Sequence, residues 1–109
     1  TLKTLKKNRS IAVLGDMLEL GEFSAQAHAQ VGVKAYETGC DIVLTFGSEA
    51  ESIASAFTEK GGTAKAFSDK MELTLYLIGI LQKNDTVLFK GSRGMKMEEI
   101  FNYIYENME

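Results

Sequence analysis

Ile11-Ala-Val-Leu-Gly15 is a short apolar run, rich in β-branched residues, that stops at a glycine. Residues 41–46 and 86–89 have the same character, and residues 64–67 form a weaker run of the same kind. The three stronger runs do not alternate apolar with polar residues, so nothing in them marks a solvated face. They are therefore predicted to be strands buried on both faces, as in a parallel sheet.

Segments of helical length separate these strands. In the first of them Ala27, Val31 and Ala35 recur every four residues, with Ser24 as the N-cap and Gly39 as the stop. The methionines and tyrosines of the last segment fall on core spacing, and we expect them in the core. Helices are predicted over residues 24–38, after a capping box of Ser48 and Glu51, after a cap at Ser68 or Asp69, and over about residues 95–107.

Strand and helix alternate four times, and parallel strands need the crossovers that such helices provide. The expected fold class is α/β, a Rossmann-like three-layer sandwich with a mainly parallel sheet. The 109 residues are enough for one hydrophobic core, so residues 1–109 are expected to form a single domain. The pattern leaves the order of the strands within the sheet open.

The composition excludes several functional classes. Fifteen acidic and twelve basic residues give a net charge of −3, so no broad surface for nucleic acid or an anionic membrane is expected. No stretch approaches the roughly 18 apolar residues of a membrane span. A single cysteine, Cys40, and a single histidine exclude a disulfide framework and a zinc cluster, and Cys40 is interpreted as a packing residue. The ATP phosphate-binding loop and the dinucleotide glycine motif are also missing.

The candidate site is the edge of the sheet at which the parallel strands end, because ligands of such sheets bind there. Three predicted strands are followed by a glycine, Gly15, Gly47 or Gly91, and each glycine is followed by polar residues. Glycine permits a sharp turn and a close approach of the backbone to a ligand. We expect the three loops to lie at one edge.

The loop Lys90-Gly91-Ser92-Arg93-Gly94 joins a strand to a helix, so free helix amides point into it. Lys90 and Arg93 add positive charge, and a guanidinium can hold a carboxylate through two parallel hydrogen bonds. The expected ligand is an anion, either a carboxylate or a phosphate. The competing interpretation is a strand–helix turn with two solvated cations.

Other polar residues follow the first two strands. Asp16 and Glu19 could hold an ammonium group, a magnesium-bound water or a partner's arginine, or could be surface acids of a capped connection. Ser48 could hydrogen-bond a ligand, although a helix cap explains it as well. His28 lies near the amino end of a helix, which favours the neutral imidazole; it could bond to a substrate, but a lone helical histidine is more often structural.

Two longer runs resemble one protein family. They are residues 11–21, with His28 seven residues further on, and residues 87–98. Both are similar to the C-terminal domain of the Mur ligases of peptidoglycan synthesis. The run Gly91-Ser-Arg-Gly-Met95 is similar to the branch that adds a D-alanyl-D-alanine dipeptide. The resemblance extends from about Arg9 to the last predicted helix.

The resemblance implies a three-domain, cytoplasmic bacterial enzyme that uses ATP and Mg2+ to activate the carboxylate of a UDP-N-acetylmuramoyl tripeptide. The amino group of D-alanyl-D-alanine then forms an amide, a step of cell-wall biogenesis on which cell shape and division depend. In this family the N-terminal and central domains hold the UDP end and the ATP phosphates. The C-terminal domain closes over them with the amino substrate, and residues 1–8 would be the remnant of the preceding connection.

The resemblance divides the candidate residues between two sides of a substrate cleft. On the dipeptide side, where cations suit the free carboxylate, it places Lys90, Gly91, Ser92 and Arg93, with Gly47 and Ser48 beside them. On the domain-closure or nucleotide side it places Asp16, Glu19 and His28. No catalytic residue and no metal ligand is expected in this chain, because holding an amine against an activated carboxylate is a task of positioning.

The chain by itself is expected to be inactive, because the family's phosphate-binding loop and UDP-binding domain are not in this sequence. A first residue of Thr1 rather than methionine agrees with a piece of a longer enzyme. The alternative is a free-standing Rossmann-like module that binds a small anion or a protein partner.

Overall fold

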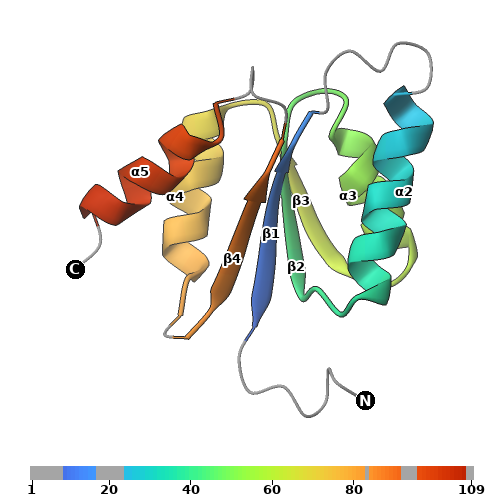
Figure 1. Ribbon diagram of the computed structural model, residues 1–109, viewed down its shortest axis with the longest axis horizontal. Helices are drawn as coiled ribbons and strands as arrows, with labels where there is room; N and C mark the ends of the chain where they lie inside the picture. The colour runs from blue at the N-terminus through green and yellow to red at the C-terminus, as the bar shows by residue number, and fades with distance from the viewer. Residues whose placement is uncertain (1–8, 17–23, 83, 92–95, 108–109) are drawn as a thin grey trace.

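The computed structural model describes residues 9–16, 24–82, 84–91 and 96–107. Strands and helices alternate along these residues (Figure 1). The elements are β1 (Ser10–Gly15), α2 (Ser24–Glu37), β2 (Ile42–Phe46), α3 (Glu51–Glu59), β3 (Thr63–Phe67), α4 (Lys70–Ile80), β4 (Thr86–Lys90) and α5 (Glu98–Asn107). The strands form one sheet in the order β3-β2-β1-β4, and every pair of neighbours is parallel.

The sheet is the middle layer of a three-layer sandwich. Helices α2 and α3 lie on one face, and α4 and α5 lie on the other (Figure 1). Because side chains alternate along a strand, β1 serves both cores. Its Ala12 and Leu14 join the core under α3, and its Ile11 and Val13 join the core under α4 and α5. The predicted Rossmann-like α/β class is confirmed.

Two of the predicted helix boundaries are confirmed by their hydrogen bonds. Gly39 has a φ of +89°, its amide donates to the carbonyl of Tyr36 at 3.1 Å, and the amide of Cys40 donates to that of Ala35 at 3.1 Å. This pair of bonds is the Schellman motif that ends α2. At the start of α4, the Asp69 side chain accepts a hydrogen bond of 3.0 Å from the amide of Met71, as expected of an N-cap.

The predicted capping box at Ser48 is wrong. Helix α3 begins at Glu51, its N-cap residue is Ala50, and no side chain of the cap residue bonds to the helix. Instead the carboxylate of Asp16, at the end of β1, accepts a hydrogen bond of 2.6 Å from the amide of Ala50. An acceptor from a neighbouring strand has replaced the local cap, so the helix has no need of the Ser48 hydroxyl.

The prediction of strands buried on both faces holds for β1 and β2 but is wrong for β4. Thr86, Leu88 and Lys90 of β4 are exposed, and Leu88 keeps 58% of its surface. The physical reason is that β4 is the edge strand, and α2 packs mainly against α3 rather than over β4.

The last helix also differs from expectation in two respects. It begins at Glu98, because Lys96 has a φ of +50°, which is not helical. Tyr105 is 76% exposed and stacks on the exposed ring of Phe101, so it is not a core residue. Ile100 of the same helix is buried as predicted.

Candidate functional site

The glycine-terminated strands are neighbours at one edge of the sheet. Leu14 of β1 is paired with Lys90 of β4, which brings Gly15 and Gly91 together one residue later. A Cβ atom on Gly91 would lie 3.3 Å from the Cα and amide nitrogen of Gly15 and 3.1 Å from Cγ of Met97. The backbones of β4 and β1 therefore approach closely at this edge, where the parallel sheet was expected to bring the glycines together.

Gly47 lies at the same edge of the sheet, directly after β2. Its φ is +111°, in the left-handed region, and a Cβ atom there would overlap the carboxylate of Asp16. Its amide donates to the carbonyl of Phe67 at 3.1 Å, which ties the end of β2 to the end of β3. The backbone conformation and the close carboxylate both require glycine at this position.

Asp16 is buried, with 7% of its surface exposed, and its Oδ1 atom accepts the Ala50 amide. A carboxylate at a helix N-terminus is favoured by the helix dipole as well as by the hydrogen bond. In this structure Asp16 joins β1 to the start of α3 and offers little surface to a ligand. Sequence reasoning missed this role, although an acid directly after a strand, combined with an apolar N-cap residue, is a signal that could have indicated it.

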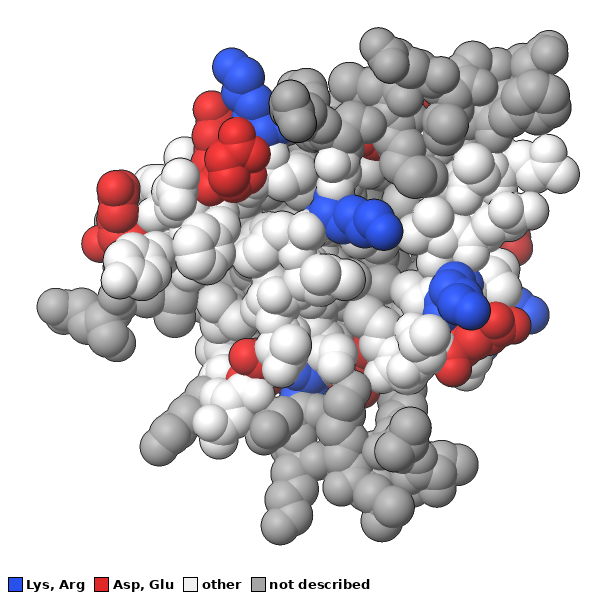
Figure 2. All heavy atoms as spheres, viewed as in Figure 1, with Lys and Arg blue, Asp and Glu red and all other residues white. Residues whose placement is uncertain are grey.

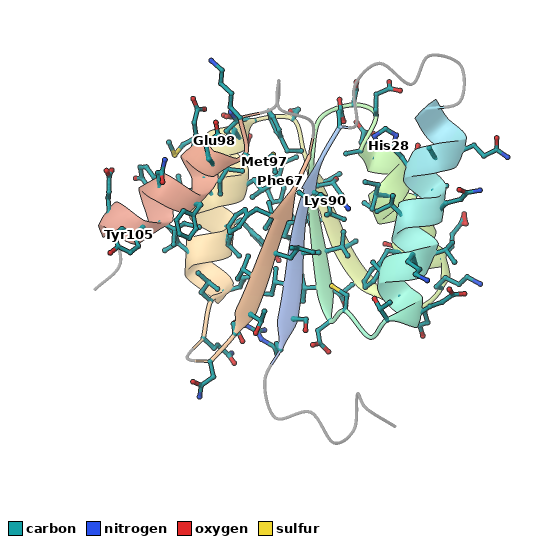
Figure 3. All side chains as sticks on the ribbon, viewed as in Figure 1. His28, Phe67, Lys90, Met97, Glu98 and Tyr105 are labelled. Carbon is teal, nitrogen blue, oxygen red and sulfur yellow. The ribbon has the colours of Figure 1, made fainter. Side chains whose placement is uncertain are left out.

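His28 is wholly buried in this structure. It lies on the first half of α2, near the upper end of α3 (Figure 3). Because it is buried, its imidazole can influence a ligand only through the residues that enclose it.

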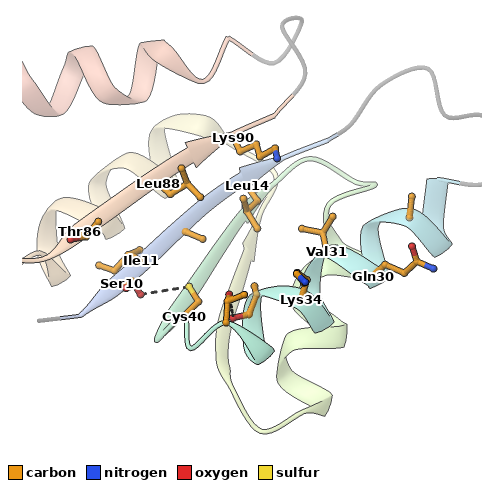
Figure 4. A pocket seen from close by; sticks show the side chains of 14 residues that line it. Ser10, Ile11, Leu14, Gln30, Val31, Lys34, Cys40, Thr86, Leu88 and Lys90 are labelled. Atoms are coloured by element: carbon orange, nitrogen blue, oxygen red, sulfur yellow. Dashed lines mark hydrogen bonds between the residues drawn. The ribbon is translucent and has the colours of Figure 1, made fainter. Parts of the chain in front are cut away.

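Lys90 and Ser48 are the exposed members of the candidate set among the described residues. Lys90 ends β4 and lines the upper end of a groove between β4, β1 and α2 (Figures 3 and 4). Ser48 lies on the turn that follows β2 and borders a hollow beside α2 and α3. Glu19, Ser92 and Arg93 lie outside the residues that the structure describes.

A family model for the Mur ligase C-terminal domain, described as the glutamate ligase domain of Mur ligases, matches residues 1–93. The chain belongs to the Mur ligase family. The UDP-N-acetylmuramoyl-tripeptide–D-alanyl-D-alanine ligase of Escherichia coli K12 is 39% identical over 99 residues, which are 89% of this chain and 21% of that protein. The ligase of the same name from Bacillus subtilis is 33% identical, over 91% of this chain and 22% of that protein.

Solved structures of Mur ligases have the same fold. A MurF structure from Acinetobacter baumannii superposes with a TM-score of 0.82 at 27% identity, over 97% of this chain and 24% of that one. The MurF ligase of Thermotoga maritima in complex with ADP superposes with a TM-score of 0.72 at 28% identity, over 91% of this chain and 22% of that one. This Mur ligase domain thus spans about one fifth of the length of its relatives.

The described part of this Mur ligase domain contains no cluster of metal-binding side chains. No group of three or more His, Cys, Asp or Glu side chains lies together there in a way that could hold a metal ion. The buried carboxylate at the edge, Asp16, already accepts the Ala50 amide. Within the same residues, no helix has the length and apolar character needed to cross a bilayer.

Proposed function

We propose that this domain is the C-terminal part of a cytoplasmic bacterial ligase that uses ATP to join D-alanyl-D-alanine to UDP-N-acetylmuramoyl-tripeptide. Within that enzyme it binds the dipeptide and closes over the two preceding domains. The observation that supports this most directly is the glycine-lined edge of β2, β1 and β4. In the sequence, Ser92 and Arg93 follow Lys90 and Gly91 of that edge, and the relatives of this chain bear the name of that ligase.

The dipeptide D-alanyl-D-alanine carries one free carboxylate and one free amine, and this edge suits the carboxylate. Lys90 is exposed at the end of β4, and Arg93 follows three residues later in the sequence. Charge-assisted hydrogen bonds from these cations would anchor the carboxylate. Ser48 is exposed on the adjacent turn, within reach of the same end of the sheet.

The work of this domain is positioning rather than proton transfer. Anchoring the carboxylate sets the direction of the amine, and correct orientation of two reactants contributes a large part of a catalysed rate. Asp16 and His28 belong to the closing side of the cleft in this proposal. Their burial favours a part in holding the edge rigid, and Glu19 would contact the preceding domains.

ATP and Mg2+ supply the activation of the tripeptide carboxylate, and in this proposal they are held mainly by the central domain. The chain by itself is therefore expected to bind part of the substrate set without turning it over.

A ligation assay on the full-length parent protein tests the proposal. Phosphate release would be measured with ATP, Mg2+ and UDP-N-acetylmuramoyl-tripeptide, with and without D-alanyl-D-alanine, and with the 109-residue chain in parallel. We expect release that depends on the dipeptide from the parent and none from the 109-residue chain. A folded, ATP-binding parent that shows no such dependence would contradict the dipeptide assignment and favour another amino substrate or a binding module.

A further inference from the structure

Lys70 is the first residue of α4, and its ammonium group contacts α5, the turn before α5 and the end of β2. It donates a hydrogen bond of 2.7 Å to Oε1 of Glu99 and one of 3.4 Å to the carbonyl of Lys96. It also lies 5.7 Å from the centre of the Phe46 ring. Figure 2 shows acidic and basic side chains gathered at this corner of the molecule, where α4 and α5 begin. Lys70 thus joins the start of α5 to α4 and to β2.

The backbone from which Lys70 extends is itself attached to the sheet. The carbonyl of Phe67, the last residue of β3, accepts a hydrogen bond of 3.1 Å from the amide of Gly47. The Asp69 side chain then accepts one of 3.0 Å from the amide of Met71, which fixes the start of α4. A group that Lys70 holds is consequently held relative to the ends of β2 and β3.

The turn that Lys70 contacts has an unfavourable backbone conformation. Lys96 has a φ of +50°, in the left-handed region that is costly for a residue with a Cβ atom. Such a conformation persists where the surrounding contacts enforce it. Here the Lys96 carbonyl accepts from the amide of Glu99 at 3.0 Å as well as from Lys70. Met97, the next residue, is buried in the core under α4 and α5 (Figure 3). Contacts with α4 and the core therefore hold this turn.

The same turn lies against the glycine edge. A Cβ atom on Gly91 would lie 3.1 Å from Cγ of Met97, so Met97 packs directly beside the backbone at the end of β4. In the sequence, residues 92–95 connect these two points. One end of that connection is fixed by the pairing of β4 with β1, and the other by the core and by Lys70. The position of the second end sets the distance that the connection has to bridge.

We propose that Lys70 is a positioning residue of the ligase: by holding the turn at Lys96 and Glu99, it fixes one end of the loop that contains Arg93. In this arrangement Lys70 contacts no substrate atom and acts through the loop. Its effect on the substrate rests on the proposed function, whereas its hold on the turn can be measured without any substrate. Glu99 is more than half exposed, and an exposed ion pair adds little to stability. Loss of the ammonium group should therefore alter the loop without unfolding the domain.

The first test measures the hold on the turn in the full-length parent without substrate. Lys70→Met keeps the aliphatic stem and removes the ammonium group. Lys60→Met makes the same change at an exposed position after α3 and is the matched control. Hydrogen exchange followed by mass spectrometry would report on a peptide that covers residues 96–101. We expect its amides to exchange about fivefold faster in Lys70→Met and at the parent's rate in Lys60→Met. Equal exchange in the two variants would overturn the proposal.

The second test measures the effect on the substrate. We expect Lys70→Met to raise the KM for D-alanyl-D-alanine about three- to tenfold, less than the loss of a direct charge-assisted contact would. The KM for ATP and the midpoint of thermal unfolding should stay unchanged, and Lys70→Arg, which retains charged donors, should restore the dipeptide KM. An unchanged dipeptide KM in Lys70→Met, or an equal rise in Lys70→Arg, would refute the positioning role.

The two tests separate this inference from the proposed function. A parent whose phosphate release does not depend on the dipeptide contradicts the proposed function, and the exchange rates still decide whether Lys70 holds the turn. A parent that does depend on the dipeptide, combined with a Lys70→Met variant of unchanged exchange and unchanged KM, refutes the role of Lys70 alone.

Discussion

Asp16 and Gly47 depend on each other at the candidate site. The carboxylate of Asp16 occupies the space that a side chain at position 47 would need. From there it accepts a hydrogen bond from the Ala50 amide. Ala50 is wholly buried, so its amide has no access to water as an alternative acceptor. The edge of the sheet is thus held in place by one glycine and one buried carboxylate.

Gly47→Ala is expected to destabilise the domain by at least about 1–2 kcal/mol, the cost of a left-handed conformation for a residue with a Cβ, since the new methyl group also overlaps Asp16. Urea denaturation would measure the change. Gly79→Ala is the matched control, because Gly79 is in α4 with no atom near its Cβ position. Alanine at 79 should be neutral or stabilise by about 0.5–1 kcal/mol. Equal midpoints for the two variants would contradict the steric argument.

Asp16→Ala is expected to cost about 1–3 kcal/mol, because it leaves the buried amide of Ala50 without its acceptor. Asp16→Asn retains an oxygen acceptor and loses only the charge at the helix N-terminus, so a smaller loss of about 0.3–1 kcal/mol is expected. Chemical denaturation would measure the free energy of unfolding of both variants and check that Asp16→Ala loses more of it than Asp16→Asn. If both lose the same stability, the hydrogen bond to Ala50 is not the reason why Asp16 matters.

At the scale of elements, Arg9 joins the start of β1 to the end of α4 and to the start of the neighbouring strand β4. Its guanidinium donates to both carboxylate oxygens of Asp85, at 3.2 and 2.7 Å, and to the carbonyl of Ile80 at 2.6 Å. The Arg9 carbonyl in turn accepts from the amide of Thr86 at 2.9 Å. These bonds join β1, the end of α4 and the start of β4 at the end of the sheet where the strands begin, opposite the glycine edge.

The stability of the domain should fall in acid partly through Asp85. The Arg9 side chain donates hydrogen bonds that hold the pKa of Asp85 below its ordinary value of 3.8. A carboxyl with a lowered folded pKa stabilises the fold above its unfolded pKa and loses that contribution as the pH falls through the folded value. We expect the urea midpoint of Asp85→Asn to change less between pH 7 and pH 3 than that of the unmodified chain. An unchanged pH dependence would contradict the role of this pair.

Elements whose signals are local were predictable from the sequence, and elements whose partners are distant were not. The glycine after α2 was predicted, and Asp69 was one of the two residues predicted to cap α4; the hydrogen bonds at both positions span at most five residues. The cap of α3 comes from Asp16, 34 residues earlier in the chain. An acid directly after a strand hints at such a role, but only the fold shows which helix it caps. The exposure of Leu88 likewise follows from the edge position of β4, which only the strand order reveals.

At the scale of the whole molecule, the domain is expected to act as the part of a larger ligase that carries the amino substrate. The described residues that we propose to contact substrate, Gly47, Ser48, Lys90 and Gly91, lie at one edge of the sheet. Closure against the preceding domains would therefore involve this edge.

Arg93→Ala in the full-length enzyme is expected to raise the KM for D-alanyl-D-alanine more than the KM for ATP. Loss of one charge-assisted contact costs about 1.5–3 kcal/mol, which corresponds to about a 10- to 100-fold change. Steady-state kinetics with each substrate varied in turn would measure the two KM values. Lys60→Ala, which removes an exposed cation at the far end of α3, is the control and should change neither constant. An unchanged dipeptide KM in Arg93→Ala would contradict the assignment.

The sequence by itself determined the alternation of strands and helices, the α/β class, the three glycine-terminated strands and the resemblance to the Mur ligases. These properties rest on short-range periodicity and on residues close together in the chain. Only the tertiary structure decided the order β3-β2-β1-β4, the burial of Asp16 and His28, and the open groove beside Leu88. Strand order and burial depend on contacts between distant segments, and a strand that pairs on one side only has the same local sequence pattern as one that pairs on both.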